Sequence, residues 1–420
     1  MQPPWPAPLA PSPVRATVTV PGSKSVTNRA LVLAALSQTP STLHRPLRSR
    51  DTLLMAGALR TLGADIADTD TDWHVTPAPL TGPAVLDVGN AGTVMRFLPP
   101  LATLADGDVH FDGDLRARER PIGPMLEGLV GLGASMTSEG GRLPLTVHGR
   151  GWLLGGKVEV DASLSSQFVS ALLLTAPRFA DGVEVAHVGG RLPSGLHIRM
   201  TVEMLRSAGA IVEHADMNVW RVEPGPLNLG RVTVEPDLSN AAPFLAAAAV
   251  TGGTVTVPDW PVRTSQAGDA LRHLLERFGA RCRLEPEGLT VSGPDSLQGI
   301  DVDLGEVGEL TPVITALCAL ARGPSTLRGI SHLRHHETDR LAALSREITA
   351  LGGDVTELPD GLSIRPRPLT GGVFATYDDH RLATAAAVLG LCVEGVLVEN
   401  VETTGKTMPG FVDLWTGMLA

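Results

Sequence analysis

The sequence predicts an α/β protein of two domains, each built from three β-α-β-α-β-β units. One supporting observation is a strand that breaks into a polar turn and then an apolar helix, a pattern that recurs about every 70 residues. A second is a helix that closes on glycine before a new strand, as helix C-caps do. The strands end near Val20, Val88, Val160, Val234, Leu304 and Thr376, and the closing glycines are Gly63, Gly133, Gly209, Gly279 and Gly352.

Hairpin-like strand pairs follow the closing glycines and complete the units, as at residues 282–293. The strand at 14–20 has no unit before it, and the last unit ends in the segment 411–420 without a hairpin. We therefore expect the N-terminal strand to pair with the C-terminal units. The predicted domains are 21–231 and 1–20 plus 232–420, with a hinge near 21 and 231 and the active site in the cleft between the domains.

Length and composition exclude several classes of protein. A chain of 420 residues is too long for one ordinary hydrophobic core, so two domains are expected. The net charge of −11 argues against nucleic acid as a general partner. No apolar run approaches the ~18 residues of a membrane span, so we expect no membrane partner.

The N-terminal residues and the cysteines indicate a cytoplasmic protein. Residues 1–13 are rich in proline and lack the basic start and apolar core of a signal peptide, so we expect a disordered tail. Cys282, Cys318 and Cys392 lie in apolar surroundings and lack the spacing of metal ligands. We expect three buried thiols in a reducing compartment.

The first predicted helix start is a candidate anion site. The strand at 18–20 ends at Pro21, and the turn 23–25 with Lys24 and Ser25 opens an apolar helix that contains Arg29. The free N–H groups and the dipole of a helix N-terminus attract an anion, and Lys24 adds a charge. A capped helix start with solvated charges is the simpler interpretation of one such turn. The recurrence of the turn favours a binding site.

The next three helix starts differ in their side chains. At 87–96, glycines such as Gly92 allow a ligand to approach the backbone. At 161–167, the hydroxyl and amide groups of Ser165, Ser166 and Gln167 suit phosphate or hydroxyl oxygens, although serines also cap helices. The start at 235–240 is mostly acidic and is interpreted as a cap.

Acid and base candidates come from the C-terminal half. Glu309 lies at a helix start without a cation and is the candidate general base, unless it only complements the helix dipole. Glu337 and Arg340 are three residues apart, so they share a helix face or form an intrahelical salt bridge. Arg381 lies on a first helical turn, and Lys406 in a glycine-containing loop. The adjacent pair at 335–336 lacks zinc-type spacing, so we expect no metal.

These cations predict substrates that carry several phosphate and carboxylate charges. The sequence contains no nucleophilic Ser-His pair, reactive Cys motif or cofactor fingerprint. We therefore expect a reaction that depends on positioning and acid–base chemistry between two anionic small molecules. The expected cationic set is Lys24, Arg29, Arg96, Arg120, Arg340, Arg381 and Lys406.

Seven motifs together resemble the 5-enolpyruvylshikimate-3-phosphate (EPSP) synthase family. They are PGSKSVTNRA, GNAGT, RERPIGP, SSQF, HETDR, DDHR and GKT, and they span residues 21–409. The resemblance implies a six-unit, inside-out α/β barrel of the enolpyruvyl transferase type. It also implies transfer of the enolpyruvyl group of phosphoenolpyruvate to the 5-hydroxyl of shikimate 3-phosphate. This is a step of chorismate and aromatic amino-acid biosynthesis and the target of glyphosate. It implies no cofactor, and we expect a monomer.

The resemblance also implies roles for individual residues. Glu309 would take the proton of the 5-hydroxyl, and Glu337 with Lys24 would move protons at C3 of phosphoenolpyruvate. The implied shikimate 3-phosphate ligands are Lys24, Ser25, Arg29, Ser165, Ser166, Gln167, Ser194, Glu309 and His336. The implied phosphoenolpyruvate ligands are Lys24, Gly92, Arg120, Gln167, Arg340, Arg381 and Lys406.

The sequence departs from the family pattern at three positions. Glu309 stands where many members have aspartate, His336 where many have lysine, and His197 where a tyrosine is common, in a segment that also contains Ser194. Two alternatives stay open. One is the related enolpyruvyl transferase that acts on UDP-N-acetylglucosamine, which resembles SGAKN at the first turn and has a loop cysteine that is missing here. The other is a non-catalytic anion-binding protein.

Overall fold

The computed structural model describes residues 3–420 and divides into two compact units. We call Gly22–Val234 the N-unit, and Glu235–Ala420 with the described residues up to Pro21 the C-unit. The division lies close to the two positions at which the sequence predicts a hinge, and the hinge itself stays a prediction.

The β-strands of both units follow one plan. The strands of the N-unit are β3 (Ser41–His44), β4 (Asp65–Asp68), β5 (Asp72–Thr76), β6 (Ala84–Asp87), β7 (Asp106–Asp112), β8 (Met136–Ser138), β9 (Leu145–Arg150), β10 (Gly156–Asp161), β11 (Val183–Val188), β12 (Val212–Asp216), β13 (Val219–Val222) and β14 (Arg231–Thr233). Those of the C-unit are β1 (Trp5–Pro6), β2 (Arg15–Thr17), β15 (Thr254–Pro258), β16 (Arg281–Glu285), β17 (Gly288–Ser292), β18 (Asp301–Asp303), β19 (Ser325–Arg328), β20 (Asp354–Leu358), β21 (Gly361–Arg365), β22 (Gly372–Phe374) and β23 (Val396–Val398).

Within residues 3–420 these strands form six small sheets, three in each unit. Five sheets join a parallel pair to an antiparallel hairpin, as in the order β6-β7-β9-β8. The sixth has only β22, β23 and β1. The six-fold β-α-β-α-β-β repeat is therefore confirmed, including its shortened last copy.

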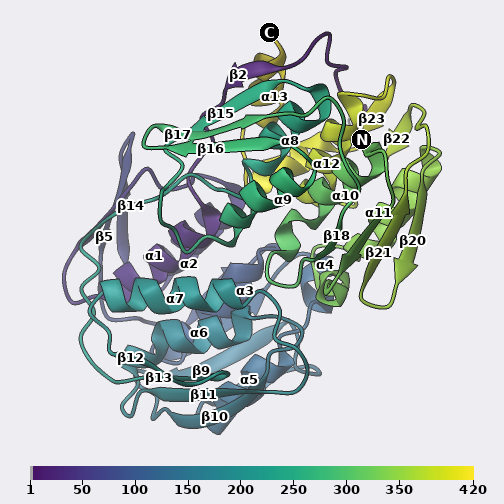
Figure 1. Cartoon of the computed structure of the whole chain (residues 1–420). Coiled ribbons are helices and arrows are strands. Elements are labelled where there is room, and N and C mark those ends of the chain that lie inside the picture. Colours follow the sequence, from purple (N-terminus) through teal and green to yellow (C-terminus); the bar gives the residue numbers. More distant parts are fainter. Residues whose placement is uncertain (1–2) are drawn as a thin grey trace. The chain divides into compact units, whose positions relative to one another are not determined.

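Each unit has three inner helices that pack against one another. They are α1 (Lys24–Leu36), α3 (Gly92–Ala102) and α6 (Gln167–Thr175) in the N-unit, and α8 (Ala242–Thr251), α10 (Thr311–Leu320) and α12 (His380–Gly390) in the C-unit. Every residue of α3 and of α12 is buried, as expected for inner helices that other elements surround on all sides. In Figure 1, α6 lies over the sheet formed by β10–β13.

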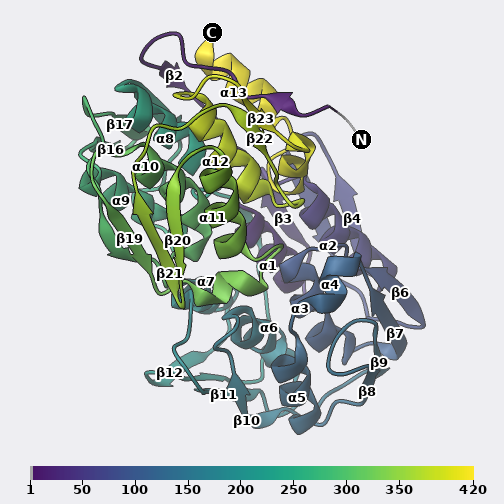
Figure 2. The same ribbon diagram turned by 90° about the vertical axis from the view of Figure 1, so that its right-hand side faces the viewer.

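The remaining helices have an exposed face or are short. The longer ones are α2 (Arg50–Thr61), α5 (Gly123–Gly131), α7 (Gly195–Ser207), α9 (Leu271–Arg277), α11 (Arg340–Ala350) and α13 (Phe411–Leu419). The short ones are α4 (Leu115–Glu119), η1 (Ala176–Arg178), η2 (Ala267–Ala270), η3 (Gly308–Leu310), η4 (Ser331–His335) and η5 (Val401–Lys406). Figure 2 shows α11 beside β20 and β21, which it covers on one face. None of the helices in residues 3–420 combines the length and the apolar composition needed to cross a bilayer.

Two strands pair outside the unit into which they lead. Strand β2 leads into α1 of the N-unit but runs parallel to β15 of the C-unit. Strand β14 leads into α8 of the C-unit but runs parallel to β3 of the N-unit. The expected pairing of the N-terminal strand with the C-terminal units is therefore confirmed.

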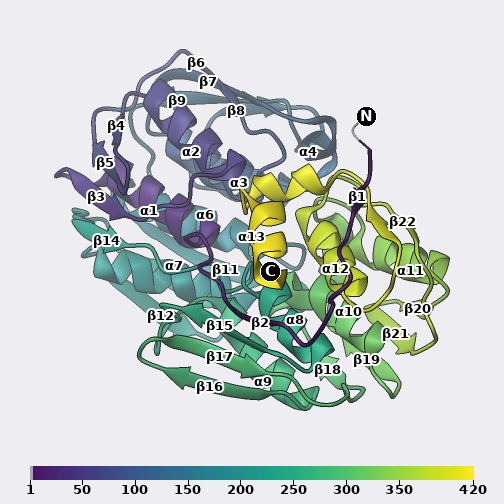
Figure 3. The ribbon, with the colours of Figure 1, turned by 90° about the horizontal axis from the view of Figure 1, so that it is seen from above.

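The prediction of a disordered N-terminal tail is wrong for its described part, residues 3–13. Trp5 and Pro6 pair with β23 as an edge strand, where proline is tolerated. The Trp5 ring meets Phe411 of α13 edge-on, with 6.4 Å between ring centroids. Figure 3 shows this segment running from β1 to β2 along the C-unit. Local sequence did not reveal the pairing because the partner strand lies almost at the other end of the chain.

The cysteines are only partly as predicted. Cys318 is buried, Cys282 is partly exposed, and Cys392 is exposed by its surface area. Desolvation nevertheless raises the pKa of Cys392 to about 11, because protein atoms surround the sulfur more closely than the exposure of the whole residue indicates. None of the three thiols is activated, since desolvation raises the other two pKa values to about 12.

Candidate active site

The start of α1 presents Lys24 beside a buried carboxylate. Ser23 caps the helix and accepts a hydrogen bond from the N–H of Val26. Lys24 Nζ lies 3.4 Å from Oδ2 of Asp51, which lies in the first turn of α2 and is 1 % exposed. The carboxylate therefore fixes the ammonium group at the helix N-terminus.

The starts of α3 and α6 meet around Gly92. A Cβ atom at Gly92 would lie 2.8 Å from Nη2 of Arg120, 3.1 Å from Nη1 of Arg96 and 3.4 Å from Oε1 of Gln167. Arg96 donates to Oε1 of Gln167 over 3.0 Å, and Asn28 of α1 donates to Thr93 over 2.6 Å. The sequence-predicted residues Gly92, Arg120 and Gln167 therefore lie together, close to α1.

Neutral oxygens hold the two arginines of this group. Arg120 donates to the backbone and side-chain oxygens of Asn90, each over 2.9 Å. It is 4 % exposed and lies at the C-terminal end of α4. The Arg96 guanidinium also lies over the ring of Phe168, 5.5 Å from its centroid. We call Lys24, Gly92, Arg96, Arg120 and Gln167 the N-cluster.

Arg29 connects α1 with α7. Its Nε donates to Thr201 over 2.8 Å, and its terminal nitrogens donate to the carbonyl oxygens of Ser25 and His197. The guanidinium also lies over Phe97, and the residue is 1 % exposed. Arg29 therefore holds the first turn of α1 at Ser25, and the family resemblance assigns both residues to shikimate 3-phosphate.

The predicted serines lie at helix starts. Ser166 is the N-cap residue of α6, and the Ser165 hydroxyl accepts the N–H of Gln167 over 3.3 Å. Ser194, the N-cap residue of α7, has φ 52, a left-handed conformation that is strained for a residue with a Cβ. Such strain is common at ligand sites.

Arg340 is the centre of a buried ionic network in the C-unit. It donates to both carboxylate oxygens of Asp379, over 2.7 and 3.1 Å, and to Glu337 over 3.0 Å. Its Nη1 lies 3.2 Å from Nδ1 of His336. Burial works to lower the pKa of Arg340, but the Asp379 and Glu337 carboxylates outweigh it and raise the pKa above its usual value. The guanidinium therefore stays charged although only 2 % exposed.

Glu337 bridges two cations. Its Oε1 accepts from Lys406 Nζ over 3.0 Å, while Oε2 faces Arg340. The sequence predicted that Glu337 and Arg340 share a helix, which is wrong because Asp339 caps α11 and the helix begins at Arg340. The predicted salt bridge exists, but it joins a loop residue to the first residue of the helix.

Glu309 lies in η3, just before α10, and contacts the starts of two other helices. Its Oε2 accepts from the Ser239 hydroxyl over 3.2 Å and lies 3.7 Å from Nη2 of Arg381. Arg381, on the first turn of α12, also donates to the carbonyl oxygen of Ser239 over 2.7 Å. The Glu309 side chain is 29 % exposed. We call Glu309, Glu337, Arg340, Arg381 and Lys406 the C-cluster, with His336 at its edge.

Four supporting residues were missed from the sequence. Asp51 holds Lys24, Asn90 holds Arg120, Ser239 links Glu309 with Arg381, and Asp379 holds Arg340. Ser239 lies within the mostly acidic helix start at 235–240 that was interpreted as a cap. Asp379 lies within the DDHR motif, so its position beside Arg381 already indicated that it lies near the site. Asn90 likewise lies within the GNAGT motif. Asp51 acts through the fold alone, and no pattern in the sequence indicates its partner.

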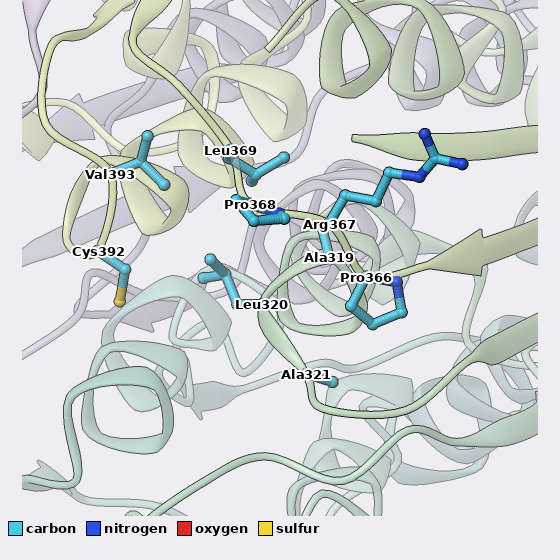
Figure 4. A pocket seen from close by; sticks show the side chains of 9 residues that line it. All are labelled: Ala319, Leu320, Ala321, Pro366, Arg367, Pro368, Leu369, Cys392 and Val393. Atoms are coloured by element: carbon cyan, nitrogen blue, oxygen red, sulfur yellow. The ribbon is translucent and has the colours of Figure 1, made fainter. Parts of the chain in front are cut away.

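A hollow of about 460 Å³ in the C-unit is lined by residues that belong to neither cluster. Figure 4 shows that apolar side chains such as Leu320, Leu369 and Val393 line it, together with Cys392 and Arg367. It contains none of the predicted site residues.

The family is decided by comparison with known proteins. The family model described as EPSP synthase (3-phosphoshikimate 1-carboxyvinyltransferase) matches residues 9–415. The chain belongs to the EPSP synthase family. A curated 3-phosphoshikimate 1-carboxyvinyltransferase from Kocuria rhizophila is 55 % identical over 428 aligned positions, which cover 99 % of this chain and 96 % of the relative.

Solved structures support the same fold. An EPSP synthase from Acinetobacter baumannii superimposes with a TM-score of 0.80 at 24 % identity, covering 98 % of this chain and 97 % of that one. The enolpyruvyl transferase NikO from Streptomyces tendae superimposes with a TM-score of 0.76 at 17 % identity, covering 98 % and 96 %. The two-domain, inside-out α/β fold expected for the family is therefore confirmed.

Proposed function

We infer that the chain transfers the enolpyruvyl group of phosphoenolpyruvate to the 5-hydroxyl of shikimate 3-phosphate and releases phosphate. The observation that carries this function is the 55 % identity to a curated 3-phosphoshikimate 1-carboxyvinyltransferase over 99 % of the chain. The two clusters support it chemically, because they combine several buried cations with carboxylates that can move protons. The reaction is the shikimate-pathway step of aromatic amino-acid biosynthesis.

In this proposal, residues of both clusters bind phosphoenolpyruvate. Arg120 and Gln167 converge on Gly92, where the bare backbone leaves room for a small anion. The proposed partners in the C-cluster are Arg340, Arg381 and Lys406. Cations around the departing phosphate stabilise its developing charge, and one such preorganised contact is worth ~3–4 kcal/mol. Lys24 contacts both substrates.

Shikimate 3-phosphate is held mainly by the polar helix starts of the N-unit. Hydroxyl and amide donors there suit its phosphate and hydroxyl oxygens, and Arg29 keeps two of these helices in place. Glu309 and His336 complete the set from the C-unit. The proposed ligands of the N-unit are Lys24, Ser25, Arg29, Ser165, Ser166, Gln167 and Ser194.

Glu309 and Glu337 carry the proton transfers. Glu309 takes the proton of the 5-hydroxyl as its oxygen attacks C2 of phosphoenolpyruvate. Glu337, with Lys24, delivers a proton to C3, which becomes a methyl group. Glu337, again with Lys24, then removes a proton from that methyl group as the C2–O bond to phosphate breaks. Closure of the hinge excludes water during these steps.

The proposal extends to assembly and location. We propose that the chain acts as a monomer. The three cysteines are free thiols with no disulfide among them, which supports a reducing compartment such as the cytoplasm. Sedimentation measurements test the monomer.

A coupled phosphate-release assay tests the function. We expect release only when shikimate 3-phosphate and phosphoenolpyruvate are both present. Turnover only with UDP-N-acetylglucosamine as acceptor would favour the related transferase. Binding of both substrates without phosphate release would favour a non-catalytic anion-binding protein.

A further inference from the structure

Three residues with strained backbones lie where the C-cluster is assembled. Tyr377 and Asp378, which directly precede Asp379, have φ 52 and φ 56, and Asn400, just before η5, has φ 45. Side chains with a Cβ rarely adopt this left-handed conformation, and it persists only where surrounding contacts fix it. Contacts from neighbouring elements must therefore stabilise this turn.

Glu347 of α11 supplies two of these contacts. It is 6 % exposed, and its Oε2 accepts the N–H of Ala375 over 2.9 Å. Its Oε1 accepts the hydroxyl of Tyr377 over 2.6 Å. Arg346 also donates to this hydroxyl over 3.1 Å and lies over the tyrosine ring. The phenol is thus fixed from two sides.

Helix α11 contacts the turn at Tyr377 and Asp378 through a second residue, Arg340. Arg340 begins α11 and lies seven residues before Glu347, so both side chains share one helix face. Arg340 holds Asp379 through both carboxylate oxygens, and Glu347 holds the chain just before Asp379. Two attachments on one rigid helix therefore determine where Asp379 and the start of α12 lie.

The opposite side of the turn is tied to the segment that carries Lys406. The carbonyl oxygen of Asp378 accepts the Thr403 hydroxyl over 2.7 Å, and the Asp378 carboxylate accepts from Asn400. Thr403 and Lys406 belong to η5. The turn is therefore a joint between α11, α12 and η5, each of which carries one cation of the C-cluster.

We propose that Tyr377 and Glu347 are positioning residues that hold this turn so that Arg340, Arg381 and Lys406 converge on phosphoenolpyruvate. The proposal rests on the proposed function, since it concerns how that substrate is held. Neither residue touches substrate; both act through Asp379 and through the backbone of the turn. Small displacements of such groups weaken binding strongly, because the cations must meet the anion together.

Tyr377→Phe and Glu347→Gln test the proposal by steady-state kinetics. Phenylalanine keeps the ring of Tyr377 but removes its hydroxyl. Glutamine in place of Glu347 has one acceptor oxygen, so either the N–H of Ala375 or the hydroxyl of Tyr377 then faces an NH₂ group. We expect each variant to raise the KM for phosphoenolpyruvate about tenfold, with kcat reduced less than about threefold. The KM for shikimate 3-phosphate should stay within about twofold of wild type. The effect of the double variant should be smaller than the sum of the two single effects, because both variants weaken the contact between Tyr377 and Glu347.

Asp269→Asn is the matched control. It weakens another partly buried carboxylate contact of the C-unit, with Trp260 and Arg272, and none of these three residues belongs to the C-cluster. Its KM for phosphoenolpyruvate should equal that of wild type. If Tyr377→Phe does not fold, Glu347→Gln carries the test alone.

The outcomes separate this inference from the function itself. An unchanged KM for phosphoenolpyruvate in both variants, or an equal rise for both substrates, would overturn the positioning role while leaving the reaction intact. Absence of phosphate release by the wild type would overturn the function and this inference together.

Discussion

The arginines of the N-cluster and the cations of the C-cluster are held by different kinds of partner, while Lys24 of the N-cluster faces the Asp51 carboxylate. Amide and carbonyl oxygens hold Arg96 and Arg120, whereas carboxylates face Arg340, Arg381 and Lys406. A guanidinium on neutral acceptors keeps its charge for an anionic ligand. When a guanidinium is paired with carboxylates, their negative charge partly compensates its positive charge, but the carboxylates can accept and donate protons. We infer that the N-cluster mainly binds, while the C-cluster binds and also carries out the acid–base steps.

The largest expected effect tests the acid–base role of the C-cluster. Glu309→Gln keeps the hydrogen bond from Ser239 but removes the base, so kcat should fall by about a hundredfold to ten-thousandfold. Binding of shikimate 3-phosphate, measured by calorimetry, should change little. Glu306→Gln, an exposed neighbour, is the control and should retain wild-type kcat. Near-normal turnover of Glu309→Gln would remove this residue as the base.

The second prediction concerns the buried ionic network of the C-cluster. Arg340→Met leaves the fully buried Asp379 carboxylate without its main cation, which should cost about 3–5 kcal/mol of unfolding free energy. Denaturant unfolding measures this loss. Arg334→Met breaks more exposed pairs with Asp339 and Glu357 and should cost no more than about 1 kcal/mol. Equal losses in the two variants would contradict the structural role of the network.

The third prediction tests the binding role of the N-cluster. Gly92→Ala places a methyl group 2.8 Å from Arg120, which cannot retreat easily because Asn90 holds it. The KM for phosphoenolpyruvate should rise about tenfold, equivalent to ~1.4 kcal/mol, and sensitivity to glyphosate should fall. Gly57→Ala, with nothing within 4 Å of the added methyl, is the control. Unchanged KM and inhibition would place Gly92 away from the ligand.

The smallest effect concerns a contact outside both clusters. Burial works to raise the pKa of Asp269, but donation from Arg272 and Trp260 outweighs it and lowers the pKa below 3.8. The pair therefore adds stability above that pH and loses it as pH falls through the lowered pKa. Because both side chains are partly exposed, the contribution should be below ~1 kcal/mol. The unfolding free energy, measured between pH 5 and pH 2, should depend slightly less on pH in Asp269→Asn than in wild type. An unchanged pH dependence would contradict the lowered pKa of Asp269.

Periodic features were predictable from the sequence, and long-range ones mostly were not. The repeat, the helix starts and the cations at Lys24, Arg120 and Arg381 follow from patterns within short stretches. The β1–β23 pair did not follow, because residues at opposite ends of the chain form it. The start of α11 was misplaced because the charged run before it resembles a helical turn, whereas Asp339 caps the helix at Arg340. Asp51 lies in none of the motifs, and its role depends on the fold.

A crystal structure of the Glu309→Gln variant with shikimate 3-phosphate and phosphoenolpyruvate bound tests most directly whether both clusters serve one reaction. We predict that oxygens of phosphoenolpyruvate lie within hydrogen-bonding distance of Arg120 from the N-unit and of Arg340, Arg381 and Lys406 from the C-unit. Phosphoenolpyruvate bound by the residues of one unit alone would contradict this prediction.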